Sequence, residues 1–335
     1  MPAPALSVAM SVYNGERYLA SAIESVLAQS FGDFEFLILD DGSRDSTARI
    51  IDAHAARDPR IRPIMRENRG LIASLNQLLA EARAPIVARM DADDLCHPER
   101  FAKQMAFLSA NPDHGVVGSW SEDIDENGAP HITPGNDHPV THEEMLAAIE
   151  NDTALLCHPV VTYRRDVVLS VGGYHRAYRH VEDFDLWLRL AEITRMANIP
   201  ERLLRYRHYA GQVSNRHATE QQIGHTVAML AYRERRAGRP DPTADLGALP
   251  PVGEFDALFG RAGIDKAIRA RLARALLYSP TGLRDQGFEL ILQHLRDGGG
   301  HAGMWKTVAR LLRFGEPRRA ARLAAVLAGM GQAAG

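Results

Sequence analysis

Hydrophobic and polar positions follow a regular block pattern over the first 120 residues. Short apolar runs, typical of buried parallel strands, alternate with longer segments that carry apolar residues at helical spacing. The predicted strands are 6–12, 34–39, 61–65, 86–90 and 115–120, and the predicted helices are 16–29, 46–56, 71–82 and 99–110. This alternation predicts an α/β fold with a mostly parallel central sheet flanked by helices.

The pattern loosens after residue 120 and changes again near residue 214. The expected elements are a turn at 125–128, helices at 143–150 and 183–192, and strands at 160–164 and 203–208. Beyond residue 214 the chain is rich in Ala, Arg and Leu, and it predicts a helix at 220–236 followed by four or five more. We therefore expect an α/β part up to residue 214 and an all-helical region at 215–335.

An acidic run, Met90 to Asp94, ends the predicted strand 86–90. Three carboxylates in four residues repel one another, so such a run is tolerated mainly where a cation binds or water reaches the side chains. Mg²⁺ takes one or two protein carboxylates together with phosphate oxygens, which makes Asp91 and Asp93 candidate metal ligands. The alternative is a solvated acidic turn in which Asp94 supports the turn and the following helix.

A second acidic turn, Asp40 to Ser43, ends the strand 34–39. Ligands of open α/β sheets bind at the carboxyl ends of the strands, and Asp41 could accept hydrogen bonds from a base or ribose. The alternative is a helix start capped by Ser43 or Asp45, and for Asp45 we favour the cap. The glycine fingerprint of dinucleotide-binding folds and the Walker lysine loop are both absent, which disfavours a Rossmann dehydrogenase or a P-loop kinase.

Further polar residues could carry chemistry downstream. Glu182 and Asp183 open a predicted helix, where spacing alone favours a simple acidic first turn and the alternative is a general base. His158 is a lone histidine of the kind that is usually structural, and Trp187 is available for packing. Arg207 could supply a cation for phosphate, although an arginine at a strand edge usually pairs with a surface acid.

Composition sets broad limits on the protein. The 335 residues are 45% hydrophobic and 24% charged, as in an ordinary globular protein, and the net charge of −3 gives no indication of nucleic-acid binding. Cys96 and Cys157 form neither a metal-binding spacing nor a disulfide framework. The chain contains no run of eighteen apolar residues, and the run Leu6 to Val12 is too short for a signal core, so we expect a cytoplasmic protein.

Several stretches together resemble a known family. They are 7–15, 25–31, 40–43, 88–94, 158–159, 172–174, 182–187 and 206–207. In this order they resemble the family-2, inverting, GT-A-type (Rossmann-like) glycosyltransferases of bacterial polysaccharide and cell-envelope synthesis. The Gln-x-x-Arg-Trp motif of the processive members is missing, which favours addition of one or a few sugars.

The resemblance implies roles for individual residues. The residues that match nucleotide-sugar-binding positions are Ser11, Tyr13, Asn14, Glu16, Asp41, Asp91, Ala92 and Asp93. Asp91 and Asp93 match the Asp-x-Asp motif that holds Mg²⁺ or Mn²⁺ against the donor diphosphate. Asp183 matches the catalytic base, with Glu182 beside it in acceptor handling. Weaker acceptor or phosphate contacts are implied for His158, Trp187 and Arg207.

The implied activity is metal-dependent transfer from a nucleoside-diphosphate sugar, with a UDP-sugar favoured. The sugar would pass to a hydroxyl of a glycan or lipid-linked acceptor by single displacement. Residues 1–214 would form the catalytic domain, with 1–120 as the donor half and 121–214 as the acceptor half. One alternative, a sugar-phosphate nucleotidyltransferase, needs a glycine-rich loop with a basic residue, which 13–16 does not supply. The other, a non-catalytic carbohydrate-binding or scaffold protein, is weakened because both acidic motifs and the base are intact.

The last predicted helices carry a basic face. Between residues 304 and 323 the positive residues are Lys306, Arg310, Arg313, Arg318, Arg319 and Arg322. We favour a helical hairpin with a solvated basic face and a turn at 315–317. The alternative is an amphipathic segment that places the protein peripherally on the inner face of a membrane.

Overall fold

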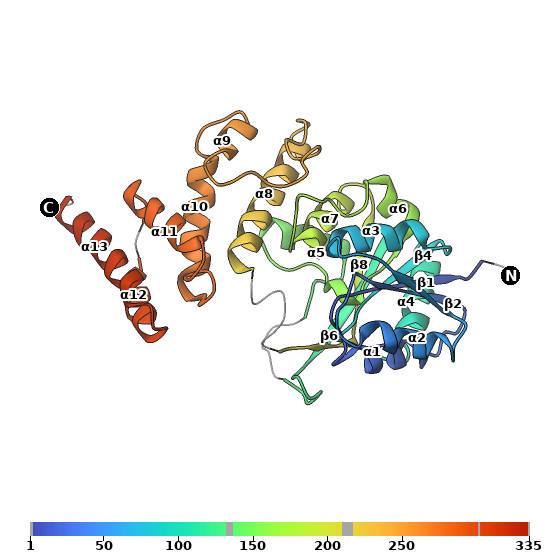
Figure 1. The fold of residues 1–335 in the computed structure, drawn as a ribbon. Coiled ribbons are helices and arrows are strands. Elements are labelled where there is room, and N and C mark those ends of the chain that lie inside the picture. Colours follow the sequence, from blue (N-terminus) through green and yellow to red (C-terminus); the bar gives the residue numbers. More distant parts are fainter. Residues whose placement is uncertain (1–2, 132–136, 210–216, 301, 334–335) are drawn as a thin grey trace. The chain divides into compact units, whose positions relative to one another are not determined.

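A computed structural model describes residues 3–131, 137–209, 217–300 and 302–333 (Figure 1). The chain folds into two compact units, Met1–His175 with Glu182–Tyr209 and Arg176–Val181 with Ala210–Gly335. The boundary predicted at residue 214 lies outside the described residues. In the described ranges, no helix has the length and apolar character needed to cross a bilayer.

The first unit is built on one sheet whose described strands follow the order β3-β2-β1-β4-β7-β6-β8-β5. The strands are β1 Leu6–Val12, β2 Phe34–Asp40, β3 Ile61–Met65, β4 Ile86–Asp91, β5 Leu95–Cys96, β6 His114–Ile124, β7 Thr162–Arg164 and β8 Arg195–Arg207. Strands β3, β2, β1 and β4 pair in parallel, as do β6 and β8, whereas β7 and β5 pair antiparallel with their neighbours. The predicted α/β class with a mostly parallel sheet is confirmed.

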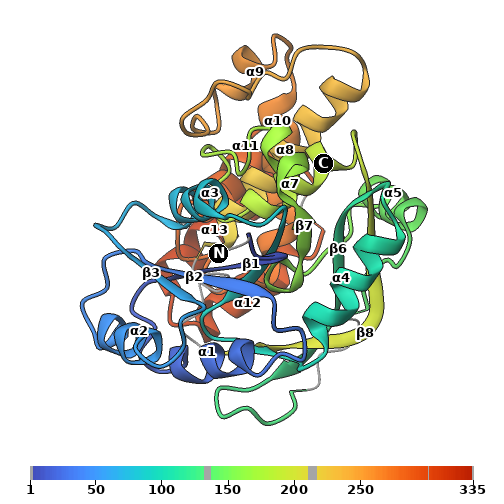
Figure 2. The same cartoon turned by 90° about the vertical axis from the view of Figure 1, so that its right-hand side faces the viewer.

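Helices cover both faces of the parallel half of the sheet. The helices of the first unit are α1 Leu19–Leu27, α2 Thr47–Ala55, α3 Leu71–Glu81, α4 Arg100–Ala110, α5 His142–Glu150, α6 Arg165–Ser170 and α7 Glu182–Leu190. Helices α1 and α2 lie on one face of β1 and β2, and α3 lies on the other (Figures 1 and 2). Because both faces are covered, every residue of β2 is buried, which explains the continuous apolar runs that revealed these strands.

Four elements differ from the sequence-based expectation. Strand β8 begins at Arg195, eight residues before the predicted start, and the short α6 and β5 were not predicted. The strand expected at 160–164 begins as a 3₁₀ turn at His158–Val160, and only Thr162–Arg164 is extended. Strand β5 follows the acidic turn directly and pairs with the end of β8, so it brings that turn to β8.

The second unit is helical in its described part. After α8 Ala218–Arg236 come α9 Phe255–Leu258, α10 Ile264–Ala275, α11 Gly287–Arg296, α12 Met304–Arg313 and α13 Pro317–Ala333. Their number agrees with the four or five helices expected. Helices α12 and α13 form the expected hairpin, whose turn contains Gly315 with a φ of 75°, and Arg322 of α13 pairs with Glu289 of α11. Membrane association of the basic face stays a prediction.

A buried arginine connects α4 to the sheet. The side chain of Arg100 is fully buried, and its Nη2 donates hydrogen bonds to the carbonyl oxygens of Arg89 at 2.7 Å and Val161 at 3.3 Å. Its Nε donates to Oε1 of Gln104 at 3.1 Å. Burying a charge is costly unless hydrogen bonds compensate, so this network fixes α4 against β4 only while it is complete.

Replacing Arg100 by Met should destabilise the first unit by about 2–4 kcal/mol, because the carbonyl oxygens of Arg89 and Val161 and the amide of Gln104 each lose a hydrogen bond. Urea denaturation followed by circular dichroism would measure the loss. Arg57→Met, at an exposed arginine, is the matched control and should change stability little. Equal stability of Arg100→Met and the wild type would show that the network contributes nothing.

Candidate active site

The predicted nucleotide-sugar-binding residues lie in or just after β1, β2 and β4, at the carboxyl ends of these strands. In the sheet register Ser11 lies beside Asp91 of β4 and Leu39 of β2, and Val12 lies beside Asp40. The two acidic turns therefore follow strands on either side of β1. The expectation that they share one edge of the sheet is met.

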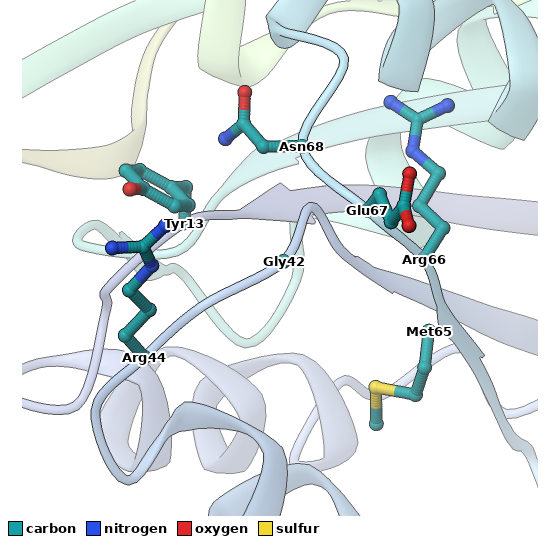
Figure 3. Close-up of a pocket in the computed structure, with 7 residues that line it drawn as sticks. All are labelled: Tyr13, Gly42, Arg44, Met65, Arg66, Glu67 and Asn68. Atoms are coloured by element: carbon teal, nitrogen blue, oxygen red, sulfur yellow. The ribbon is translucent and has the colours of Figure 1, made fainter.

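A pocket of about 540 Å³ lies beside the turns that follow β1 and β2. Its lining residues are Tyr13, Gly42, Arg44, Met65, Arg66, Glu67 and Asn68. Tyr13 and Arg44 lie on one side of Gly42, and Arg66 and Glu67 lie on the other (Figure 3). Gly42 has a φ of 80°, and a Cβ there would lie 2.7 Å from the backbone nitrogen of Asn68, so only glycine fits this position.

Asp41 holds one wall of this pocket. It is buried, and its carboxylate accepts hydrogen bonds from Nε of Arg66 at 2.9 Å and from the backbone nitrogens of Arg69 at 3.0 Å and Gly70 at 2.8 Å. These bonds fix the segment that supplies the lining residues 65–68. Contact of Asp41 with a base or ribose stays a prediction, since the structure shows its oxygens engaged with the wall.

Asn14 and Glu16 shape the opposite wall. The backbone nitrogen of Asn14 donates to Oγ of Ser43 at 2.8 Å, and its Oδ1 accepts from the backbone nitrogen of Arg44 at 2.8 Å. Oε2 of Glu16 accepts from the backbone nitrogen of Ser46 at 3.0 Å. Both side chains thus position Arg44 and its neighbours, and direct nucleotide contacts by Asn14 and Glu16 remain predictions.

The prediction that Asp45 caps α2 is wrong, because the N-cap residue is Ser46 and no side chain caps it. Asp45 instead supports the turn that leads into the helix. Its Oδ1 accepts from the backbone nitrogen of Thr47 at 2.9 Å, and hydrogen bonding lowers its pKa against the effect of burial. Ser43 does not cap the helix, because its hydroxyl accepts from Asn14 instead.

The carboxylates of Asp91, Asp93 and Asp94 converge, with ligand oxygens all within 4.8 Å of one another. Oδ2 of Asp91 lies 2.5 Å from Nη1 of Arg89, and Oδ2 of Asp93 accepts from the hydroxyl of Tyr209 at 2.9 Å. Oδ2 of Asp94 is buried and has no hydrogen-bond partner in the described part of the chain. A set of hard oxygen donors with an orphaned buried oxygen fits Mg²⁺ or Mn²⁺. Ala92, between the first two, is half-buried against the core.

Burial governs the electrostatics of this acidic cluster. Burial, followed by the charge of Asp91, raises the pKa of Asp93 to about 6, while the Tyr209 hydrogen bond and Arg89 act in the opposite direction. The pKa of Asp94 is raised well above its ordinary value by burial and by its two acidic neighbours. A bound divalent cation would offset this repulsion, which is the arrangement expected of a metal site.

Asp94 supports the acidic turn, as predicted, but not the following helix. Its Oδ1 accepts from the backbone nitrogen of Arg207 at 2.8 Å, which ties the acidic turn to the end of β8. Helix α4 begins at Arg100 without a side-chain cap. The prediction that Asp94 supports the following helix is therefore wrong, and its support of the turn acts through β8.

Asp183 lies in the first turn of α7, with about a third of its side chain exposed. Its Oδ1 accepts from the backbone nitrogen of Phe184 at 2.8 Å, and its Oδ2 lies 3.9 Å from Nδ1 of His158. Burial raises the pKa of Asp183 and lowers that of His158 well below its usual range. A carboxylate beside a neutral imidazole suits proton abstraction from a hydroxyl. Glu182 beside it is buried.

Three weaker predictions need correction. Trp187 is only 1% exposed, with its ring centroid 6.0 Å from that of His158, so it packs inside the unit rather than meeting an acceptor. Arg207 is also buried, and its Nε donates to the carbonyl oxygen of Asp93 at 2.7 Å, so it braces the acidic turn rather than a phosphate. His158 is buried, lies 3.0 Å from the hydroxyl of Tyr174 and neighbours Asp183, so it packs inside the unit rather than meeting an acceptor.

Sequence reasoning missed the supporting residues. Arg66 and Tyr209 gave no local signal, because their partners lie 25 and 116 residues away in the chain. Arg89 was detectable in principle, since a lone cation inside the apolar run 86–90 indicates a buried charge that needs a partner.

The comparisons with known proteins agree with this geometry. The family described as Glycosyl transferase family 2 matches residues 7–172. EpsE of Bacillus subtilis (strain 168), named as a glycosyltransferase, is 38% identical over 195 residues, which cover 56% of this chain and 67% of EpsE. The chain belongs to glycosyltransferase family 2. The amylovoran biosynthesis glycosyltransferase AmsE of Erwinia amylovora is 30% identical to this glycosyltransferase over 219 residues, covering 63% of the chain and 79% of AmsE.

Solved structures show that this glycosyltransferase has the GT-A fold. Residues 1–349 of S. aureus TarS, in complex with UDP-GlcNAc, match it with a TM-score of 0.58 at 17% identity, covering 98% of this chain and 92% of that one. The mannosyltransferase PcManGT from Pyrobaculum calidifontis, in complex with GDP-Man and Mn²⁺, matches with a TM-score of 0.53 at 16% identity, covering 98% and 87%. The predicted fold and enzyme class are confirmed.

Asp93→Asn should stabilise the metal-free glycosyltransferase at pH 7 by on the order of 2 kcal/mol. The pKa of Asp93 lies near 6 in the folded protein against an ordinary 3.8. The unfolded chain therefore loses this proton first as pH rises, and the wild type loses stability between about pH 4 and pH 6. Asparagine removes the charge and still accepts the Tyr209 hydrogen bond.

Urea denaturation in a chelator at pH 3.5 and pH 7 would measure this effect. Asp33→Asn, at an exposed aspartate, is the matched control and should be neutral at both values. A gain that is the same at pH 3.5 as at pH 7 would contradict a raised pKa as its cause.

Proposed function

We propose that this glycosyltransferase moves a sugar from a nucleoside-diphosphate sugar, with a UDP-sugar favoured, to a hydroxyl of a glycan or lipid-linked acceptor. The observation that carries the proposal is the three-carboxylate cluster at the sheet edge that also bears the pocket lined by Tyr13 and Gly42. The UDP-GlcNAc held by TarS and the GDP-Man with Mn²⁺ held by PcManGT support a nucleotide-sugar donor. The name of AmsE supports a polysaccharide product.

The pocket provides for the base and ribose of the donor. Its volume of about 540 Å³ is ample for a nucleoside, and the half-exposed ring of Tyr13 offers a stacking surface. Ser11 lies in β1 beside Asp91, between this pocket and the acidic cluster. Asp41 and Asn14 act by holding the two walls.

Asp91 and Asp93 would hold Mg²⁺ or Mn²⁺. The ion would supply charge neutralisation on the departing nucleoside diphosphate. Arg89 orients the carboxylate of Asp91 for that task through its 2.5 Å ion pair. Tyr209 does the same for Asp93 by donating to Oδ2.

Asp183 acts as the general base. Its Oδ1 is held by the backbone nitrogen of Phe184, which leaves Oδ2 to take the proton of the acceptor hydroxyl. The acceptor oxygen then forms a bond to the anomeric carbon as the bond from that carbon to the diphosphate oxygen breaks. Because the two oxygens occupy opposite faces of the sugar, one displacement inverts the anomeric configuration.

The two alternatives have less support. A sugar-phosphate nucleotidyltransferase would need a glycine-rich basic loop after β1, where this chain has Tyr13-Asn14-Gly15-Glu16. A non-catalytic scaffold would have no use for the costly cluster of converging carboxylates at Asp91, Asp93 and Asp94, the last of which is buried. Cytoplasmic location, with or without membrane contact, stays a prediction.

Asp183→Asn should lower turnover by about 10²–10⁴-fold, the usual contribution of a general base, with binding of UDP and Mn²⁺ unchanged. Release of nucleoside diphosphate from a panel of nucleotide sugars would measure turnover, and calorimetry would measure binding. Asp166→Asn, an exposed acid in the first turn of α6, is the matched control. Unchanged turnover in Asp183→Asn would place the base elsewhere.

UDP together with Mn²⁺ should raise the melting temperature of the wild type more than either alone, because a ligand at 100 times its Kd stabilises by about 2.7 kcal/mol. Asp93→Ala should lose the part of the shift that depends on Mn²⁺, whereas Asp33→Ala should keep it. Differential scanning fluorimetry would record both. No shift with UDP or GDP and Mn²⁺ would favour the scaffold alternative.

A further inference from the structure

The second unit contains a cluster of metal-binding side chains apart from the acidic cluster. His180, His217 and Glu220 place one ligand atom each within 4.8 Å of one another. Nε2 of His180 lies 3.3 Å from Oε2 of Glu220, and Nδ1 of His217 lies 3.2 Å from the same oxygen. The catalytic proposal uses none of these three residues.

The donor types and spacings suit a tetrahedral transition-metal ion. Zinc binds imidazole nitrogen and carboxylate oxygen at about 2.0–2.2 Å, which separates two ligands of a tetrahedron by about 3.3–3.5 Å. The two measured separations, 3.2 and 3.3 Å, are close to that edge. Two imidazoles with one carboxylate form a softer donor set than the acidic cluster and favour zinc over magnesium.

The two imidazole rings are stacked. Their centroids are 3.9 Å apart, and their planes differ by 14°. An ion bound by an imidazole nitrogen lies in the plane of the ring, so one ring must turn about its Cβ–Cγ bond for both nitrogens to meet one ion. Binding would therefore separate the stack, a change confined to side-chain torsions.

The main chain holds the cluster in place. His180 has a φ of 69°, a backbone conformation that a non-glycine residue keeps only when its surroundings enforce it. Its carbonyl oxygen accepts from Nε2 of Gln221 at 3.3 Å. Helix α8 packs closely against Val181 because Gly224 has no side chain. A Cβ at this position would lie 2.5 Å from Cγ2 of Val181.

His180 is left with an unsatisfied nitrogen. Its Nε2 is buried and makes no hydrogen bond within the described residues, although it lies near Glu220. Burial lowers the pKa of His180, and neutral imidazole is the form that binds metals. His217 and Glu220 lie three positions apart at the start of α8, so they present their donors from the same helical turn.

We propose that His180, His217 and Glu220 bind a zinc-type ion that clips the segment 176–181 to the start of α8. Water fills the fourth position of the tetrahedron. The ion ties together two stretches of the second unit that are 37 residues or more apart in the chain. Along the chain, His180 stands three residues before Asp183, so the clip fixes the backbone that leads into the helix carrying the base.

Titration of chelator-treated protein with Co²⁺ would test the site, because tetrahedral Co²⁺ absorbs visible light far more strongly than octahedral Co²⁺. We expect one equivalent of absorbing Co²⁺ that Zn²⁺ displaces and Mg²⁺ does not. His217→Ala and Glu220→Gln should each weaken Zn²⁺ binding by at least about tenfold, since loss of even an outer-shell partner costs that much. His225→Ala, on the same helix but outside the cluster, should bind normally.

Asp93→Asn separates this site from the acidic cluster and should retain the Co²⁺ spectrum. Its loss in Asp93→Asn, or its persistence in both His217→Ala and Glu220→Gln, would overturn the proposal, as would no tetrahedral spectrum in the wild type. Circular dichroism would confirm folding, with His217→Gln replacing His217→Ala if the latter unfolds. Binding of UDP with Mn²⁺ should survive in His217→Ala, so failure of the clip leaves the catalytic proposal standing.

Discussion

One buried cation, Arg89, governs the electrostatics of the acidic cluster and of Asp183. It lies in β4, between β1 and β7, and pairs with Asp91. Its charge lowers the pKa of Asp93, Asp94 and Asp183 against the effect of burial. Without a cation at this point, burial would favour the protonated form of these three carboxyl groups more strongly. The guanidinium in turn is tolerated in the core only because these carboxylates surround it.

A second pair of a buried carboxylate and an arginine lies at the carboxyl end of β2. Asp41, after β2, pairs with Arg66 at 2.7 Å, and both side chains are largely buried. There the ion pair shapes a wall of the pocket, whereas the pair of Arg89 and Asp91 orients a carboxylate of the acidic cluster. In both places a strand ends in a carboxylate whose partner arginine fixes its direction. The site is therefore rigid at its base, and the donor groups it presents are set before any ligand arrives.

Some strands were located from the sequence more accurately than others, for physical reasons. Strand β1 is buried on both faces and gave a continuous apolar run, so it was located to the residue. Strand β3 was also located to the residue, although only Ile61 of it is buried. Strand β8 was found only in its second half, because its middle, around Pro200 and Glu201, is exposed and polar.

Convergence of Asp91 with the turn after β2 followed from parallel-sheet geometry. Burial of Trp187 and Arg207 could not be predicted in this way, since residue type alone does not show which side of a helix or strand faces the core. The contacts of Tyr209 and Arg66 also depend on partners distant in the chain, which one sequence cannot reveal.

The hydrogen bond from the backbone nitrogen of Arg207 to Asp94 has a consequence for folding during synthesis of the chain. The two residues are 113 positions apart, so at ribosomal speeds on the order of 10 s separates synthesis of the acidic turn from synthesis of the strand that braces it. During that interval the turn of the nascent chain lacks both the Arg207 brace and the Tyr209 hydroxyl. The acidic cluster therefore reaches its final arrangement only when β8 joins the sheet.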